Sequence, residues 1–160
     1  MKPLINHVLV ATSGSDASIN AAKYAIILAK QYKCKLSAIY VVDTATLREL
    51  LISRIFVEEE SKEYQHSLEA NGHRYLNFTE ELAIKKGVKI DKILKSGAIY
   101  TEILKTADEI GAELIILGGW EENRDVRDLI THAQKEVLLN AKCSVLVVKE
   151  HNIEAIYKNS

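Results

Sequence analysis

The chain has 160 residues, 48% of them hydrophobic, and a formal net charge of -1. This length and apolar content fit one compact domain with a substantial buried core. The near-zero charge, with acidic and basic residues spread throughout, excludes the electrostatic footprint of a nucleic-acid or membrane-surface binder. The apolar runs fall far below the roughly 20 residues that cross a bilayer, and residues 1–7 are no secretory signal, so we expect a cytoplasmic protein.

The two cysteines, Cys34 and Cys143, are far apart and lack the spacing of metal ligands. We therefore expect reduced, packed thiols, with neither a disulfide framework nor a metal site.

The first expected element is a strand over residues 7–11, a continuous apolar run of the kind that parallel sheets bury on both faces. An Ala-rich helix follows, with Ser15 or Asp16 as its N-terminal cap. A second apolar run predicts a strand over residues 36–42.

The crossover that comes next, residues 43–87, is too long for one simple helix. Two stretches have helical patterns, so we expect one short helix or loop and then one long helix. Gly72 weakens the long helix internally, and Gly87 is placed to end it.

The remaining elements continue the alternation. Residues 88–95 predict an edge strand with one wet face, and a helix that ends at Gly111 follows. A strand over 114–118, a helix through 126–138 and a strand over 144–148 complete the pattern. The fold class is therefore α/β: a single doubly wound, Rossmann-like domain over residues 1–150, with a five-stranded parallel sheet flanked by helices. The C-terminal tail, residues 151–160, lies outside the pattern and is expected to fray or to dock on a partner.

In such sheets, ligands bind beyond the carboxyl ends of the strands. The candidate turns are therefore "ATSGSDAS" after the first strand and "LGGWEENRD" after the fourth.

These turns and their surroundings resemble the universal stress protein family. The segment "HVLVATSGSDASINAAKYAIILAKQYKCKLSAIYVVD" resembles its opening strand, Ala-rich helix and second strand, while "GVKIDKILKSGAIYTEILKTADEIGAELIILGG" and "KEVLLNAKCSVLVVK" resemble its later elements. The resemblance runs from about residue 5 to 149, is weakest over 43–75, and implies an adenine nucleotide alpha hydrolase-like sheet.

Members of that family that bind ATP carry Gly-x-x-Gly, nine residues and then Gly-Ser or Gly-Thr, with an acidic residue after the first strand. On this chain only Gly118 matches the signature. Glu121, Thr131 and His132 replace the second glycine and the final pair, and Ser13 stands at the acidic position.

These replacements predict weak phosphate binding. A residue with a Cβ enters the positive-φ conformations of a phosphate loop at a cost of roughly 1 to 2 kcal/mol, which makes Thr131 a poor substitute for glycine. The carboxylate of Glu121, at about 4 Å from a phosphate and an effective dielectric of about 20, is repelled by roughly 4 kcal/mol. We predict that the frame of a nucleotide site persists without its phosphate contacts.

The first interpretation is thus a non-catalytic stress-response or regulatory domain with an impaired adenine-nucleotide pocket. No catalytic motif is present in the sequence, so weak nucleotide hydrolysis is the one activity left open. No cofactor is predicted beyond an ATP molecule bound weakly or not at all. In this interpretation Trp120, the only tryptophan, closes over the empty pocket.

The alternative is an ATP-binding switch with slow or no hydrolysis. Val41 and Leu117 still offer apolar walls for an adenine, and the helix start is expected at Thr131 and His132. The full set of candidate pocket residues is Ala11, Thr12, Ser13, Val41, Leu117, Gly118, Glu121, Thr131 and His132. A third possibility is another small anion or signalling nucleotide in the altered pocket.

The resemblance also implies a homodimer in which the last strands of two subunits pair about a two-fold axis. Such pairing covers an apolar edge strand that would otherwise invite uncontrolled association. The expected interface residues are Val145, Leu146, Val147 and Val148. A regulatory protein partner is expected as well, but the sequence does not identify it.

Overall fold

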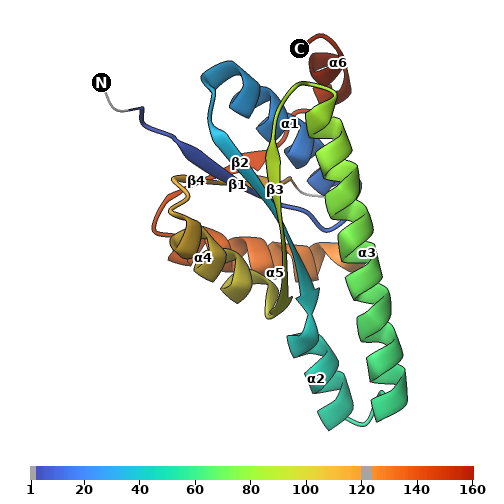
Figure 1. The fold of residues 1–160 in the computed structure, drawn as a ribbon. Coiled ribbons are helices and arrows are strands. Elements are labelled where there is room, and N and C mark those ends of the chain that lie inside the picture. The colour runs from blue at the N-terminus through green and yellow to red at the C-terminus, as the bar shows by residue number, and fades with distance from the viewer. Residues whose placement is uncertain (1–2, 120–123) are drawn as a thin grey trace.

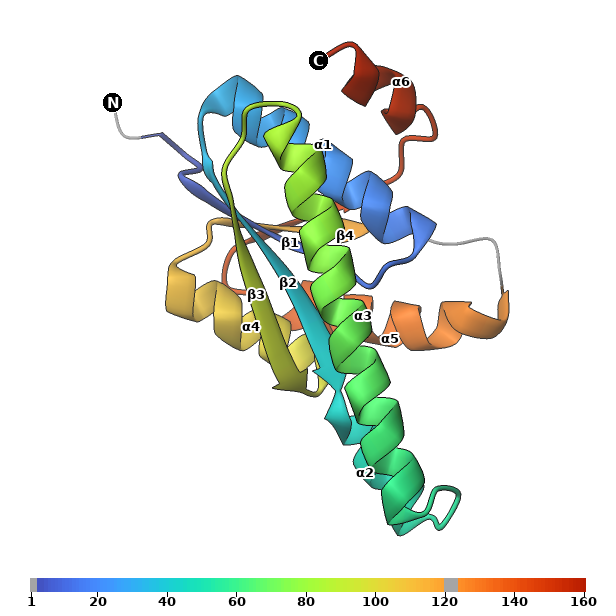
Figure 2. The same cartoon turned by 45° about the vertical axis from the view of Figure 1, so that its right-hand side comes forward.

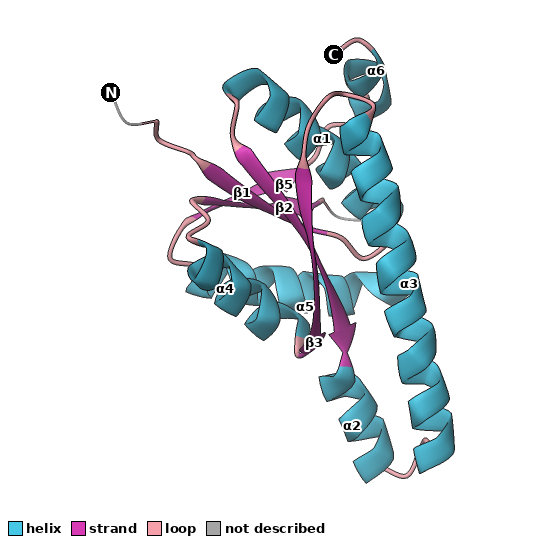
Figure 3. Ribbon diagram, in the orientation of Figure 1, coloured by secondary structure: helices cyan, strands magenta, loops and turns pink. Residues whose placement is uncertain are grey.

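A parallel five-stranded sheet forms the centre of the molecule (Figures 1 and 3). The computed structural model describes the backbone of residues 3–119 and 124–160, and their side chains apart from those of 124–131. The sheet has the order β3-β2-β1-β4-β5, which confirms the predicted α/β, Rossmann-like fold. The strands are β1 (His7–Ala11), β2 (Lys35–Asp43), β3 (Ile90–Gly97), β4 (Leu114–Gly118) and β5 (Ser144–Val148).

Helices cover both faces of this sheet (Figures 1 and 2). On one face lie α1 (Asp16–Tyr32) and α3 (Glu58–Ile84), and on the other lie α4 (Ile99–Ile110) and α5 (Arg124–Asn140). The short helix α2 (Thr44–Ile52) continues from the end of β2 and forms a hairpin with the start of α3, which projects beyond the sheet. The last helix, α6 (Ile153–Lys158), lies beside α1.

The helix α1 shows why the first crossover folds as predicted. The Ser15 side chain accepts a hydrogen bond from the Ser18 backbone N–H, so Ser15 is the N-cap. The Ala-rich face of α1 is buried against the sheet, and Ala21, Ala25 and Ile26 have no exposed surface. Small side chains on this face let the helix lie close to β1 and β4.

The long crossover also follows the prediction of one short and one long helix. Gly72, however, is not simply a weak point of α3. A Cβ on Gly72 would lie 2.7 Å from side-chain atoms of both Tyr40 and Leu94, closer than real carbon atoms pack. The glycine therefore lets α3 approach β2 and β3 at this point.

The C-terminal tail differs from the expectation that it frays or docks on a partner, because it docks on its own domain. Ile153 is 2% exposed and Tyr157 is 7% exposed, and both belong to the core between α1 and α3. The Tyr157 hydroxyl donates a hydrogen bond of 2.7 Å to the carbonyl of Leu82. These two buried side chains and the hydrogen bond hold the short helix on its own domain, and the sequence analysis did not identify them.

Among the helices of the described residues, none combines the length and the apolar character that crossing a membrane requires.

Candidate functional site

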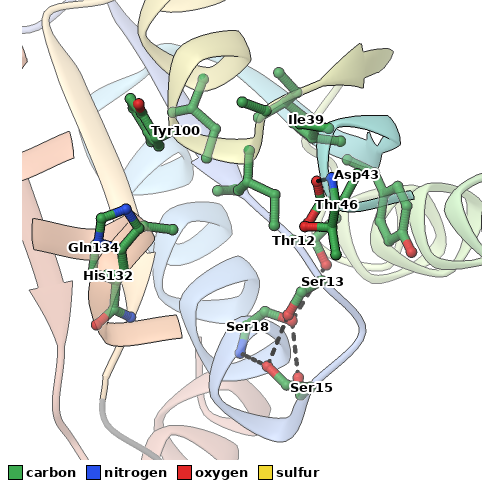
Figure 4. A pocket seen from close by; sticks show the side chains of 18 of the residues that line it. Thr12, Ser13, Ser15, Ser18, Ile39, Asp43, Thr46, Tyr100, His132 and Gln134 are labelled. Atoms are coloured by element: carbon green, nitrogen blue, oxygen red, sulfur yellow. Dashed lines mark hydrogen bonds between the residues drawn. The ribbon is translucent and has the colours of Figure 1, made fainter. Parts of the chain in front are cut away.

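The carboxyl ends of β1, β2 and β4 border a cavity of about 840 Å³. This is the edge of the sheet where ligands are expected in doubly wound folds. Its volume lies in the upper part of the range for small-molecule sites, about 300–1,000 Å³. Figure 4 shows side chains converging on it from the first turn, from the end of β2 and from α4 and α5.

The cavity brings most of the predicted pocket residues together. Its lining includes Ala11, Thr12, Ser13, Val41, Leu117, Gly118 and His132. Glu121 and Trp120 lie outside the described residues, as does the side chain of Thr131. The prediction of a shared site at this edge therefore has a geometric basis.

One part of the cavity, here called the sheet lobe, lies against the face covered by α4 and α5. Its walls are mainly apolar, and Ile39, Leu117 and Val137 are almost fully buried. Tyr100 and His132 stand at its border, with ring centroids 6.0 Å apart and planes at 90° (Figure 4). Such walls suit a flat aromatic group.

The hydroxyl groups of the first turn are largely occupied with one another (Figure 4). Ser13 Oγ donates to Ser15 Oγ at 3.1 Å, and Ser15 Oγ accepts from the Ser18 N–H at 3.1 Å. Thr12 Oγ1 and Ser18 Oγ lie 3.4 Å apart. Ser15 therefore acts as the helix cap that the sequence predicted, and this turn offers no cationic side chain to a phosphate.

Gly118 and Gly119 are both required by packing. A Cβ on Gly118 would lie 2.7 Å from the carbonyl group of Ala17, and one on Gly119 would lie 2.4 Å from the carbonyl oxygen of Val148. These close backbone approaches explain the glycine pair without a bound phosphate. Gly119 therefore serves as a tight exit from β4.

The position of Thr131 and His132 within α5 differs from one expectation. The ATP-switch interpretation placed a helix start at these residues, but α5 begins at Arg124. Residues 131 and 132 therefore lie within the helix, where backbone N–H groups bond along the helix and are not free to bind an anion. The apolar periodicity of 126–138 was the signal that could have placed the start correctly.

Gln134 is a site residue that the sequence analysis missed. Its side chain is 7% exposed, lines the cavity and donates from Nε2 to the carbonyl oxygen of Gly118 at 2.5 Å. Its Oε1 atom is buried and has no hydrogen-bond partner within the described part of the chain. Buried acceptors of this kind are normally paired, so among the described residues Gln134 Oε1 is an exception.

The charged side chains that line the cavity are acidic. Asp43 and Glu49 are both present, and the described lining residues include no Lys or Arg. Asp43 Oδ1 accepts from the Thr46 N–H at 3.1 Å and Oδ2 accepts from Thr46 Oγ1 at 2.7 Å, so this carboxylate caps α2 (Figure 4). A polyanionic ligand finds little electrostatic support on these walls.

A second part of the cavity, the hairpin lobe, extends between α2 and the start of α3. It is lined by apolar and aromatic side chains from both helices and the connecting loop: Leu47, Leu50, Phe56, Tyr64 and Leu68. The sequence analysis did not foresee this lobe, because helical patterns in residues 43–87 do not show how the two helices lie against each other.

The sheet order defines a doubly wound α/β domain, with a cavity beyond the carboxyl ends of its strands. The model of the universal stress protein family matches residues 5–149 of this chain, and the chain therefore belongs to that family. Universal stress protein MJ0531 of Methanocaldococcus jannaschii is 33% identical over 154 residues, which cover 92% of this chain and 84% of that protein.

Solved structures of family members have the same fold. The match to a universal stress protein family member from Burkholderia pseudomallei has a TM-score of 0.73 and 22% identity, covering 94% of this chain and all (100%) of that chain. A universal stress protein in complex with cAMP matches with a TM-score of 0.60 and 22% identity, over 90% of this chain and 96% of that chain. The universal stress protein from Archaeoglobus fulgidus in complex with dAMP matches with a TM-score of 0.59 and 16% identity, over 92% of this chain and 100% of that chain.

Proposed function

We propose that this protein is a non-catalytic regulatory member of its family, whose edge cavity binds a small adenine-containing ligand but disfavours a triphosphate. The observation that carries the proposal is the lining of the cavity. Apolar walls that suit an adenine, among them Val41 and Leu117, are combined with the carboxylates of Asp43 and Glu49 and with no Lys or Arg among the described lining residues. A cytoplasmic location and an unidentified protein partner belong to the same proposal.

The ligands of related proteins support a preference for ligands that carry little negative charge. Two structures of the same fold hold cAMP and dAMP, each with a single phosphate group. A nucleoside or a nucleoside monophosphate places less charge near Asp43 and Glu49 than a triphosphate does. Gln134 Oε1, which has no partner among the described residues, adds an acceptor for an amino or hydroxyl group of such a ligand.

Isothermal titration calorimetry with adenosine, AMP and Mg-ATP tests this proposal. We expect measurable binding of adenosine and AMP, and ATP binding weaker by about tenfold or more because of the acidic lining. Val41→Phe, which fills the sheet lobe, should abolish adenosine binding. Val88→Phe is the matched control, because Val88 is half-buried and does not line the cavity. Tight ATP binding, or no difference between the two variants, would contradict the proposal.

The ATP-binding switch is the second candidate, because Val41 and Leu117 line the cavity and could contact an adenine whatever the phosphate contacts are. Mass spectrometry of the purified protein under native conditions separates the two candidates, since co-purified ATP supports the switch. The variant Glu121→Gly with Thr131→Gly restores the signature glycines. If these two side chains are the obstacle, the variant should bind ATP where the unaltered chain does not.

We also propose that two copies of the chain form a homodimer through β5. This strand is an edge of the sheet, and its interface candidates Val145, Leu146 and Val147 are only half-buried in the single chain, while Val148 is 4% exposed. Pairing with a second copy would cover this edge and its free backbone groups.

A further inference from the structure

We propose that the hairpin lobe binds the hydrocarbon tail of an uncharged small molecule. The inference rests on the proposed function in treating the edge cavity as a ligand site, and it assigns a second ligand group to a part of the cavity that an adenine does not need.

The lobe is part of the folded domain and is not a gap between loose segments. Leu47 is 4% exposed although α2 projects beyond the sheet, so the hairpin has an interior of its own. The rings of Phe56 and Tyr64 pack edge to face at 5.8 Å between centroids and hold the far end of the hairpin together. Leu50 and Leu68, both half-buried, face the cavity from α2 and α3.

The lobe is continuous with the sheet lobe, because both are parts of one cavity of about 840 Å³. Tyr40, which is 7% exposed, lines the cavity from β2, where the hairpin meets the sheet. A molecule with a head in the sheet lobe can therefore extend a tail towards Leu50 and Phe56 within the same cavity.

The acidic side chains that line the cavity favour an uncharged ligand over an anionic one. The side chain of Glu49 comes from the same helix as Leu47 and Leu50, and Asp43 lies at the start of that helix. The described lining has no Lys or Arg that could pair with a carboxylate or sulfate head group. A fatty acid is therefore disfavoured, and an alcohol, ester or other uncharged amphiphile is favoured, because apolar burial is retained without the repulsion.

The first experiment uses N-phenyl-1-naphthylamine, an uncharged dye whose fluorescence rises in apolar surroundings, with the full chain. We expect saturable binding to the unaltered protein. Leu50→Glu should weaken it by about tenfold or more, because the new carboxylate lies in the lobe. The matched control is Ile52→Glu on the same helix, a residue that is 74% exposed and does not line the cavity, and it should leave binding within about twofold.

The control also separates the lobe from the exposed tip of the hairpin, where Ile52, Ile55 and Val57 lie on the surface. Loss of dye binding with Ile52→Glu but not with Leu50→Glu would place the dye on that tip and overturn the proposal. Absence of dye binding to the unaltered protein would overturn it as well.

A competition experiment needs no variant and so does not depend on folding of Leu50→Glu. Decanol should displace the dye from the unaltered protein at a concentration about tenfold lower than decanoate does, because the two differ in charge but hardly in tail. Equal competition, or better competition by decanoate, would overturn the choice of an uncharged occupant.

Adenosine calorimetry on the same proteins separates the two proposals. If adenosine fails to bind while the dye binds in a Leu50-dependent manner, the adenine ligand is wrong and the hairpin lobe stands. If adenosine binds and the dye does not, the proposed function stands and the hairpin lobe is wrong.

Discussion

Gly14 combines two demands that a side chain cannot meet. It has φ +83, and a Cβ there would lie 2.2 Å from the ring of Tyr75, which stacks on Tyr40. Gly111 also has positive φ, at +67, but a Cβ there would meet nothing within 4 Å. A side chain at Gly111 would therefore cause backbone strain alone, whereas a side chain at Gly14 would cause backbone strain and a steric clash.

We expect Gly111→Ala to lower the free energy of unfolding by about 1 to 2 kcal/mol, the cost of a left-handed conformation with a Cβ. Gly14→Ala should cost about 1 to 3 kcal/mol more, because Tyr75 must also leave its place on Tyr40. Urea denaturation of both variants measures the difference. Equal losses would show that Tyr75 moves aside freely.

Single residues also show what the sequence could and could not predict. The cap at Ser15 was predictable because it depends on neighbours three residues away. The roles of Gly72 and Gln134 were not, because each depends on a segment distant in sequence: β2 and β3 for Gly72, and the carbonyl of Gly118 for Gln134.

At the scale of elements, α6 is held by a few specific contacts. Tyr157→Phe removes the hydroxyl that donates to the Leu82 carbonyl and should lower the free energy of unfolding by about 1 to 2 kcal/mol, because it leaves a buried acceptor without its partner. Tyr32→Phe is the control, since Tyr32 is 71% exposed and should show no change. Urea denaturation compares the two variants, and a loss of the same size in both would contradict the assigned role.

A pH dependence follows from the ion pair that joins α6 to α1. The hydrogen bond from Lys23 to Glu154, together with the charges of Lys23 and Lys158, lowers the pKa of the Glu154 carboxyl in the folded state. A lowered folded-state pKa stabilises the fold above the unfolded value, about 4.3, and this stabilisation is lost as the pH falls through the folded-state pKa.

Glu154→Gln tests that dependence. The unaltered chain should have a slightly higher thermal midpoint than the variant at pH 7, because Glu154 is well exposed and solvent weakens the pair. The difference should vanish once the pH lies below the folded-state pKa. A difference that stays constant from pH 7 to about pH 2 would show that the charge of Glu154 is not its source.

Strand positions were the most predictable elements. The bounds of β1, β4 and β5 agree with the predicted 7–11, 114–118 and 144–148, because each is a continuous apolar run; β1 and β4 are also largely buried, while β5 is half-buried at the sheet edge. β3 covers Ile90–Gly97 where 88–95 was predicted, since an edge strand with many exposed residues has a weaker apolar pattern. The helix α6 was not predicted because the burial of Ile153 and Tyr157 depends on contacts with α1 and α3, which are distant in sequence.

At the scale of the whole molecule, β5 is the edge through which association is expected. In Val145→Lys the long side chain can reach solvent and places a charge on this edge. Sedimentation at micromolar concentration should show a dimer for the unaltered chain and a monomer for the variant. Leu4→Lys is the control, because Leu4 lies before β1 and is 89% exposed, and it should remain dimeric. A strictly monomeric unaltered chain would contradict the dimer.

The position of the cavity was predictable at this scale, because parallel-sheet topology favours a cavity beyond the carboxyl ends of the strands. The shape of the cavity was not. Its hairpin lobe depends on how two helices, separated by a loop at residues 53–57, close on each other, and apolar periodicity does not specify that distance.

The first half of the long helix α3 projects beyond the sheet, so a small tilt of the helix displaces its N-terminal end by a larger distance. At 1.5 Å per residue it is about 40 Å long, and Gly72, near its middle, lies against Tyr40 and Leu94 of the sheet. About 20 Å of helix separate this pivot from Glu58, so a tilt of about 5° at Gly72 displaces the tip by roughly 2 Å. If a ligand in the hairpin lobe tilts α3, the distance between paired spin labels on the tip of α3 and on α4 should change when the ligand binds.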